Sequence, residues 1–252
     1  MSEYNTASVK TVSDAIKLKR KKRRKSTLRK WFVRFLLVAI ILSISYGIYK
    51  LDQSNIFRVK AIRVSNNHVL SQEQIIDAFD ISINDRVWLI HDFMLNDIIQ
   101  DYKSIESYEL TKKNNVVLIN VNEFDVVGYK NDTLLLANGA YIDITEFNQH
   151  YLLKVPEIHG FDDEELSTRL AESLGLLTPE IRMIISSVQQ KETTYDQAQI
   201  WMVLFDQKQV FSDFRSVELL NNYHLFVDQI APGNNCIYLD YTSSSARSSV
   251  CE

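Results

Sequence analysis

The sequence predicts an α+β protein held on a single membrane-spanning helix. Residues 31–49 form an almost uninterrupted apolar run, long enough to cross a bilayer. Beyond this run, segments with the alternation of strands are interleaved with segments of helical spacing as far as residue 241. The charge balance also changes sign across the apolar run. Together these observations indicate two extracytoplasmic domains of strands and helices, each packed around an antiparallel sheet.

The apolar run WFVRFLLVAIILSISYGIY (residues 31–49) has the ~20 residues that a helix needs to cross ~30 Å of hydrocarbon. Its only charge is Arg34, near the basic end, where a long side chain can reach the headgroups. Trp31, Tyr46 and Tyr49 lie where aromatic rings favour the membrane interface. We therefore expect these four residues to anchor the span. A buried helix of a soluble protein is the alternative, but it leaves the preceding basic run unexplained.

The flanking charges predict the orientation. Residues 1–34 hold twelve Lys and Arg against two acidic residues, whereas residues 51–252 hold fifteen against thirty. Because Lys and Arg stay on the cytoplasmic side, the tail of residues 1–30 should be cytoplasmic and the rest outside. The run exceeds the ~7–15 residues of a signal-peptide core, which favours an uncleaved anchor. Basic residues 17–25 could contact nucleic acid, but beside a span they are more typical of a topology anchor that touches anionic lipid.

Residues 56–124 are expected to form a first domain. Residues 51–55 are a linker too short to hold it far from the bilayer. Its predicted elements are a strand at 57–64, a turn at 65–68, a helix opened by a capping box of Ser71 and Gln74, a helix after Asp92, and strands at 104–113 and 116–124 joined through Asn114-Asn115. We expect these strands to form an antiparallel sheet with both helices on one face, because this packing buries the apolar faces of the helices against the sheet.

Residues 125–242 are expected to form a second domain, followed by a flexible tail at 243–252. Its predicted elements are strands at 126–129, 134–136 and 141–144, helices at 163–174 and 178–185, strands at 199–205 and 209–211, a helix capped by Asp213, and a final strand at 237–241. Cys236 and Cys251 could pair, but the second lies in a Ser-rich terminus, so two free thiols are expected.

The sequence argues against several kinds of chemistry. No G-x-G loop for phosphate, no Ser-x-x-Lys of a transpeptidase and no G-x-S-x-G of a hydrolase occurs. The five histidines include no H-x-x-x-H pair for a metal. Glu123 is a lone carboxylate without the second acid of a glycosidase, and a structural ion pair is its expected role. We therefore expect no enzyme activity, no cofactor and no metal.

Several motifs resemble the bacterial cell-division family FtsQ/DivIB, in the style of its Gram-positive members. Residues 62–75 (IRVSNNHVLSQEQI) are similar to the family pattern I-x-V-x-G-N-x-x-(V/L)-S-x-E-x-I, with Asn66 at the glycine. Residues 121–129 (VNEFDVVGY) resemble V-x-E-(R/Y)-x-x-V-(A/G), and residues 155–161 (VPEIHGF) resemble L-P-x-I-x-G. Residues 237–246 (IYLDYTSSSA) resemble the closing I-D-L-R-Y-x-S-G-x-A, with Ser244 at the glycine.

The resemblance implies a POTRA domain (strand-helix-helix-strand-strand) at 56–124 and the family's "β domain" at 125–242. It also implies a non-enzymatic scaffold of the divisome, located in the cell membrane at the septum. The implied partners are small coiled-coil proteins of the FtsL and FtsB/DivIC kind, and indirectly the septal transpeptidase and its polymerase, with no nucleic acid. The alternative is another membrane-anchored POTRA protein that serves polypeptide export or assembly.

The final strand is the expected partner site. A strand that closes a chain often lies at a sheet edge, where unpaired backbone groups can accept a partner's strand. Tyr238 and Tyr241 offer aromatic anchors, and Thr242 and Ser243 adjoin them. Alternation should direct Leu239 inward and the tyrosines outward. In the alternative, both tyrosines cover the domain's own core.

Overall fold

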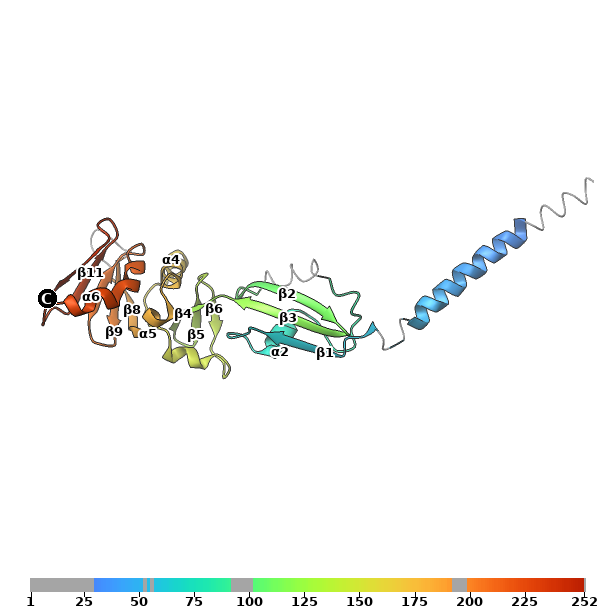
Figure 1. Cartoon of the computed structure of the whole chain (residues 1–252), viewed down its shortest axis with the longest axis horizontal. Coiled ribbons are helices and arrows are strands. Elements are labelled where there is room, and N and C mark those ends of the chain that lie inside the picture. The colour runs from blue at the N-terminus through green and yellow to red at the C-terminus, as the bar shows by residue number, and fades with distance from the viewer. Residues whose placement is uncertain (1–29, 52–53, 55–56, 92–101, 192–198, 252) are drawn as a thin grey trace, which may run out of the picture. The chain divides into compact units, whose positions relative to one another are not determined.

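The computed structural model describes residues 30–51, 54, 57–91, 102–191 and 199–251 (Figure 1). The chain divides into two compact units, residues 1–58 and residues 59–252.

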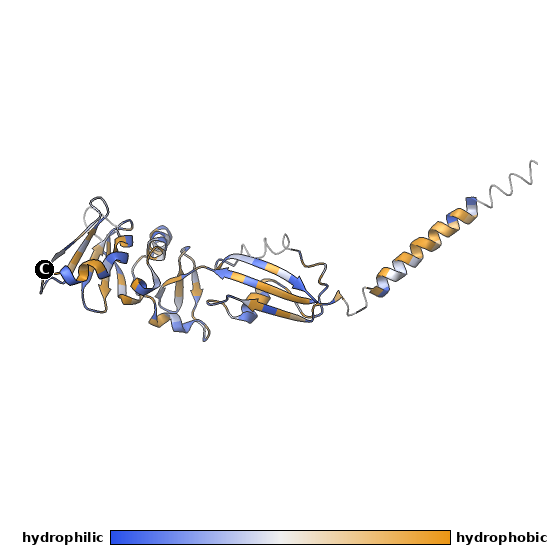
Figure 2. Ribbon diagram, in the orientation of Figure 1, coloured by the Kyte–Doolittle hydropathy of each residue, from blue (hydrophilic) through white to orange (hydrophobic). Residues whose placement is uncertain are grey.

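In the first unit, Lys30–Leu51 is a helix of 22 residues that is long and apolar enough to cross a membrane. Figure 2 shows it as mainly hydrophobic along its length. At ~1.5 Å per residue it measures roughly 33 Å, close to the thickness of the hydrocarbon core. The predicted anchor residues Trp31, Arg34, Tyr46 and Tyr49 are all exposed on it.

The second unit begins with a three-stranded sheet. Its elements are β1 (Ala61–Ser65), α2 (Gln72–Ala78), β2 (Ile105–Lys113) and β3 (Val116–Glu123). The strand order is β1-β3-β2, with β1 parallel to β3 and β2 antiparallel to β3. The expected all-antiparallel sheet is therefore wrong here. The hairpin returns β3 into the centre of the sheet, where it runs in the direction of β1.

Local signals in this first domain are confirmed. The Ser71 hydroxyl accepts the Gln74 N–H, and the Gln74 side chain accepts the Ser71 N–H, which completes the capping box. Asn66, Asn114 and Asn115 all have positive φ, as their turns require. Fully buried side chains from α2, from the residue that caps it and from β3 form the core, namely Ile75, Phe79, Val117, Ile119 and Val121. The helix expected after Asp92 lies outside the described residues.

A nine-stranded sheet follows. Its strands are β4 (Val126–Lys130), β5 (Thr133–Leu136), β6 (Tyr141–Asp143), β7 (Glu157–His159), β8 (Ile185–Lys191), β9 (Gln199–Leu204), β10 (Gln209–Ser212), β11 (Cys236–Asp240) and β12 (Ser245–Ser249). The order is β12-β11-β10-β9-β8-β7-β4-β5-β6. The β4–β7, β7–β8 and β10–β11 pairs are parallel, so the expected antiparallel sheet is in fact mixed.

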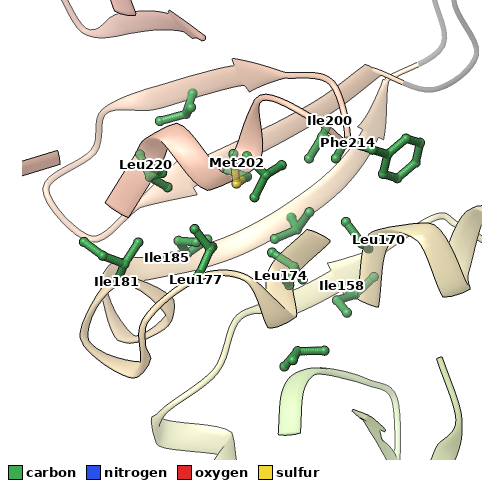
Figure 3. Packing of buried hydrophobic residues seen from close by; sticks show 14 of the residues in the cluster. Ile158, Leu170, Leu174, Leu177, Ile181, Ile185, Ile200, Met202, Phe214 and Leu220 are labelled. Atoms are coloured by element: carbon green, nitrogen blue, oxygen red, sulfur yellow. The ribbon is translucent and has the colours of Figure 1, made fainter. Parts of the chain in front are cut away.

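The helices of this part are η2 (Gln149–Leu153), α4 (Glu164–Gly175), α5 (Pro179–Ile184), η3 (Val217–Asn222), α6 (Tyr223–Phe226) and η4 (Val227–Gln229). η2 packs on a small cluster around Val126 and Leu134, and the other helices pack on a larger cluster of buried side chains, the main core. Asp163 and Thr178 cap α4 and α5 as predicted. Figure 3 shows Leu170 and Leu174 of α4 among strand residues such as Ile200 and Met202. Asp213 instead caps a turn by accepting the Arg215 and Ser216 N–H groups, and a 3-10 helix follows rather than the expected α-helix.

Three strands of this sheet were not predicted, namely β7, β8 and β12. The helix expected at 178–185 ends at Ile184, and β8 begins with the next residue. The prediction of a flexible tail at 243–252 is wrong, because Ser245–Ser249 pairs with β11.

Candidate interaction site on the C-terminal sheet

The end of the nine-stranded sheet is formed by β12, not by the predicted β11. β11 pairs with β10 on one side and with β12 on the other. The expectation that Ile237–Tyr241 is an edge strand is therefore wrong, because five further residues fold back along it. No described strand lies on the outer side of Ser245–Ser249. An unpaired strand edge is in general a template for pairing with another chain.

The side chains of β11 alternate as predicted. Leu239 is 8% exposed and belongs to the main core, whereas Tyr238 is 44% exposed. Tyr241 is 54% exposed and lies just beyond the strand, where its N–H donates to the Ser216 hydroxyl at 2.9 Å. The alternative in which both tyrosines cover the core does not hold in this structure.

The turn between β11 and β12 is organised by Asp240. Its carboxylate accepts hydrogen bonds from the Thr242 N–H at 2.9 Å, from the Thr242 hydroxyl and from the Ser243 hydroxyl at 2.9 Å. The hydroxyl bonds of Thr242 and then Ser243 hold the pKa of Asp240 below its usual value, because they stabilise the carboxylate. Ser244 has a φ of 46°, in the left-handed region that glycine adopts without strain. Thr242 and Ser243 thus shape the turn that presents β12.

An aromatic row crosses the sheet face opposite the main core and leads to this edge. Trp201, Phe211 and Tyr238 are paired in register on β9, β10 and β11, and Tyr238 faces Arg247 of β12. The ring centroids of Trp201 and Phe211 are 6.3 Å apart, and those of Phe211 and Tyr238 are 5.1 Å apart, both pairs stacked. Lys191 lies 4.6 Å from the centre of the Phe211 ring. Tyr238 is therefore held by its neighbours before any partner binds.

A disulfide fastens the edge strand. Cys251, just after β12, is bonded to Cys236 at the start of β11, with the two Cα atoms 5.1 Å apart. The Asn234 amide adds two long contacts of 3.4 Å to Ser248. The expectation of two free thiols is wrong, because antiparallel pairing returns the Ser-rich terminus to the strand that carries Cys236.

Glu123 has a structural role of a different kind from the one expected. Its carboxylate accepts the backbone N–H groups of His68, Val69 and Leu70 at 2.5–2.8 Å, so the predicted ion pair is wrong. Backbone N–H groups that donate to an ionised carboxylate form hydrogen bonds that are stronger than those between neutral groups. The same loop accepts a bond from the Asn148 amide at the Val69 carbonyl, at 3.2 Å. Glu123 therefore fixes the loop that meets the nine-stranded sheet.

The residues gathered at this edge are aromatic, hydroxyl-bearing and backbone groups. Among the described residues, no group of three or more His, Cys, Asp or Glu side chains is placed to hold a metal ion. The exposed tyrosines, the pinned turn and the open side of β12 form instead a surface that could add a strand and anchor its side chains.

Known proteins are similar to this chain in two ways, over its first domain and over most of its length. Residues 57–123 match the family model of the FtsQ-type POTRA domain. The DivIB cell-division protein of Erysipelothrix rhusiopathiae is 24% identical, covering 91% of this chain and 87% of the relative. This chain is similar to FtsQ/DivIB cell-division proteins along about nine-tenths of its length. DivIB of Bacillus cytotoxicus is also 24% identical, over 92% of both chains.

One solved DivIB structure is also similar to part of this chain. The extracytoplasmic domain of DivIB from Geobacillus stearothermophilus is 19% identical, with a TM-score of 0.36, covering 44% of this chain and 98% of that chain. The POTRA match ends at Glu123, so the candidate edge lies outside it, in the part of the chain that the POTRA model does not describe.

Proposed function

We propose that this chain is a single-pass membrane scaffold of the bacterial division machinery. The observation that carries the proposal is similarity to cell-division proteins along about nine-tenths of the chain. The apolar helix Lys30–Leu51 supports attachment to the membrane. The flanking charges support a cytoplasmic N-terminus and extracytoplasmic domains, and the division septum is the proposed location.

The proposed partners are small coiled-coil division proteins of the FtsL and FtsB/DivIC kind. One of them adds a strand to the open side of β12, and the septal transpeptidase and its polymerase are reached indirectly. Tyr238 and Tyr241 anchor the partner's side chains, while Thr242 and Ser243 hold the turn in position for it. The proposed role is non-enzymatic, since backbone pairing and aromatic contact require no catalytic group.

Crosslinked pull-down of the full chain from membranes tests this proposal. The coiled-coil proteins should be captured with the wild-type chain. Tyr241→Ala should weaken capture by about 1–2 kcal/mol, as truncation of an interface anchor does, with little change in melting temperature. Leu239→Ala should instead lower the melting temperature, because Leu239 is buried in the main core.

Tyr141→Ala is the matched control, because Tyr141 is an exposed tyrosine of β6, the strand at the other end of the sheet. Capture should survive this change. Equal loss of capture in Tyr141→Ala and Tyr241→Ala would contradict a site at β12. Capture of export or assembly proteins in place of division proteins would contradict the proposed function itself.

A further inference from the structure

A second exposed surface lies at the end of the POTRA sheet where the chain joins it. The start of β1, the end of β2 and the start of β3 meet there (Figure 1). The loop 82–90 closes over this end. The Val59 N–H donates to the Asp85 carbonyl at 2.8 Å, and the Asn84 N–H donates to the Val59 carbonyl at 2.9 Å. We name this end, comprising Val59, Lys60, the loop 82–90 and residues 112–115, the POTRA tip.

The loop of the POTRA tip exposes large apolar side chains. Ile81, just before the loop, and Ile90, its last residue, are buried in the POTRA core. Between them, Ile83, Trp88 and Leu89 are 61%, 54% and 43% exposed. Inward anchoring of the loop thus holds these three side chains outside the core, and their exposure is not explained by the packing of the POTRA domain.

Basic residues surround this apolar group. Lys60 and Lys113 are exposed and lie at the same end of the sheet, on either side of β3. The Lys60 N–H donates to the Asn115 carbonyl at 2.8 Å, and Lys113 is paired with Val116. Lys112 reaches across to the Ile90 carbonyl. The cations within the tip are Lys60, Arg86, Lys112 and Lys113, and the carboxylate within it is Asp85. The Asp85 carboxylate already accepts the Ser82 N–H at 2.6 Å.

Chain length limits how far this surface can lie from the lipid. The apolar helix ends at Leu51, and the POTRA tip begins at Val59. Eight residues span at most roughly 29 Å when fully extended. An exposed tryptophan with aliphatic neighbours and a basic rim has the composition of surfaces that settle at a bilayer interface.

We propose that the POTRA tip binds the surface of the membrane that the chain spans. Trp88, Leu89 and Ile83 enter the boundary between headgroups and acyl chains, and Lys60 and Lys113 contact anionic headgroups. The tethered domain is thereby oriented on the bilayer by a second, peripheral contact. The partner edge at β12 plays no part in this contact, so the two proposals stand or fall separately.

Fluorescence quenching in vesicles tests the proposal. The chain has three tryptophans, so Trp31→Phe with Trp201→Phe leaves Trp88 as the only one. The full chain is reconstituted in phosphatidylcholine and phosphatidylglycerol whose acyl chains are brominated near the headgroup. Bromine quenches tryptophan on contact, and we expect Trp88 emission to fall to about half of its value in unbrominated vesicles, since tryptophan settles at this depth.

Two further variants separate the contributions. Ile83→Ser with Leu89→Ser should reduce the quenching by removing apolar anchors. Lys60→Gln with Lys113→Gln should reduce it in vesicles with phosphatidylglycerol and leave it unchanged in pure phosphatidylcholine. The lysines are exposed, so this second pair should keep its melting temperature.

Three results would overturn the proposal. One is Trp88 emission that is equal in brominated and unbrominated vesicles. Another is quenching that the lysine variant does not alter in anionic vesicles. The third is quenching that disappears when the protein-to-lipid ratio is lowered tenfold, because a contact that depends on protein density belongs to a second copy of the chain.

Discussion

The POTRA sheet and the C-terminal end of the larger sheet are stabilised in different ways. The POTRA core consists of large buried side chains such as Phe79 and Ile119. Its helix α2 begins at a capping box that residues Ser71 and Gln74 form. β12 has the sequence SARSS and buries no large apolar side chain. A disulfide and the hydrogen bonds of one turn fix it instead. An edge that is held covalently, with little burial of its own, suits the strand addition that we propose for β12.

The largest expected effect is in the POTRA core. Phe79 is fully buried, with its ring edge-on to Tyr108 at 5.1 Å between centroids. Phe79→Ala should cost about 3–5 kcal/mol of unfolding free energy, because it leaves a cavity in a small core. Chemical denaturation of the full chain in detergent measures this loss. Ile83→Ala, at an exposed position next to the same helix, should cost under about 0.5 kcal/mol; similar losses in both variants would mean that burial does not distinguish them.

The next effect concerns the disulfide. Cys236→Ser with Cys251→Ser opens a loop of 15 residues, which the chain-entropy model values at about 3 kcal/mol. We expect the loss to be concentrated in β12, seen as faster amide hydrogen exchange at Ser245–Ser249 than in β9. Partner capture should fall with it. Uniformly faster exchange throughout the sheet would show that the bond stabilises the whole domain, and would remove the contrast between the two regions.

A smaller effect should follow from Glu123. Glu123→Gln replaces a carboxylate that accepts three N–H groups by an amide that has one acceptor oxygen. An N–H group that loses its acceptor lowers the free energy of unfolding. We expect a loss of about 1–3 kcal/mol, measured as a fall in melting temperature. Glu106→Gln is the control, since Glu106 accepts a single exposed bond from Asn122. An equal fall in both variants would contradict the special role of Glu123.

The smallest effect is the pH response of the β11–β12 turn. Because the pKa of Asp240 is lowered in the folded chain, its contribution is present above the unfolded value of about 3.9 and is lost as pH falls through the folded value. The carboxyl carbon shift of Asp240 in NMR should titrate below that of a model peptide. Thr242→Val should move the midpoint upward, because the hydroxyl donor is gone. An unchanged midpoint would mean that Thr242 does not organise the turn.

Much of the POTRA domain could be predicted because its signals are local. The Ser71–Gln74 capping box, the Asn114–Asn115 turn and the alternation in β3 each lie within a few residues of the contact that they make. The parallel pairing of β1 with β3 depends on residues about fifty apart, and no local pattern specifies it.

The candidate site was predicted in part for the same reason. The exposure of Tyr238 and the burial of Leu239 follow from alternation within one strand. β12 was missed because Ser-rich sequences have low strand propensity, and its pairing is fixed by Asp240 and by a disulfide whose partner is fifteen residues away. The spacing of the two cysteines was the signal that could have predicted the disulfide. Because low order is expected at a chain terminus, free thiols were predicted instead.

The proposal that β12 offers an open edge to a partner is tested most directly by amide hydrogen exchange. The exchange is measured on the full chain, with and without the captured coiled-coil partner. In the free chain, the amides of Ser245–Ser249 that point away from β11 should exchange rapidly, and those that point toward it slowly. Addition of the partner should protect the outward amides and leave β6, at the opposite end of the sheet, unchanged. Binding that leaves the outward amides of β12 unprotected would contradict strand addition at this edge.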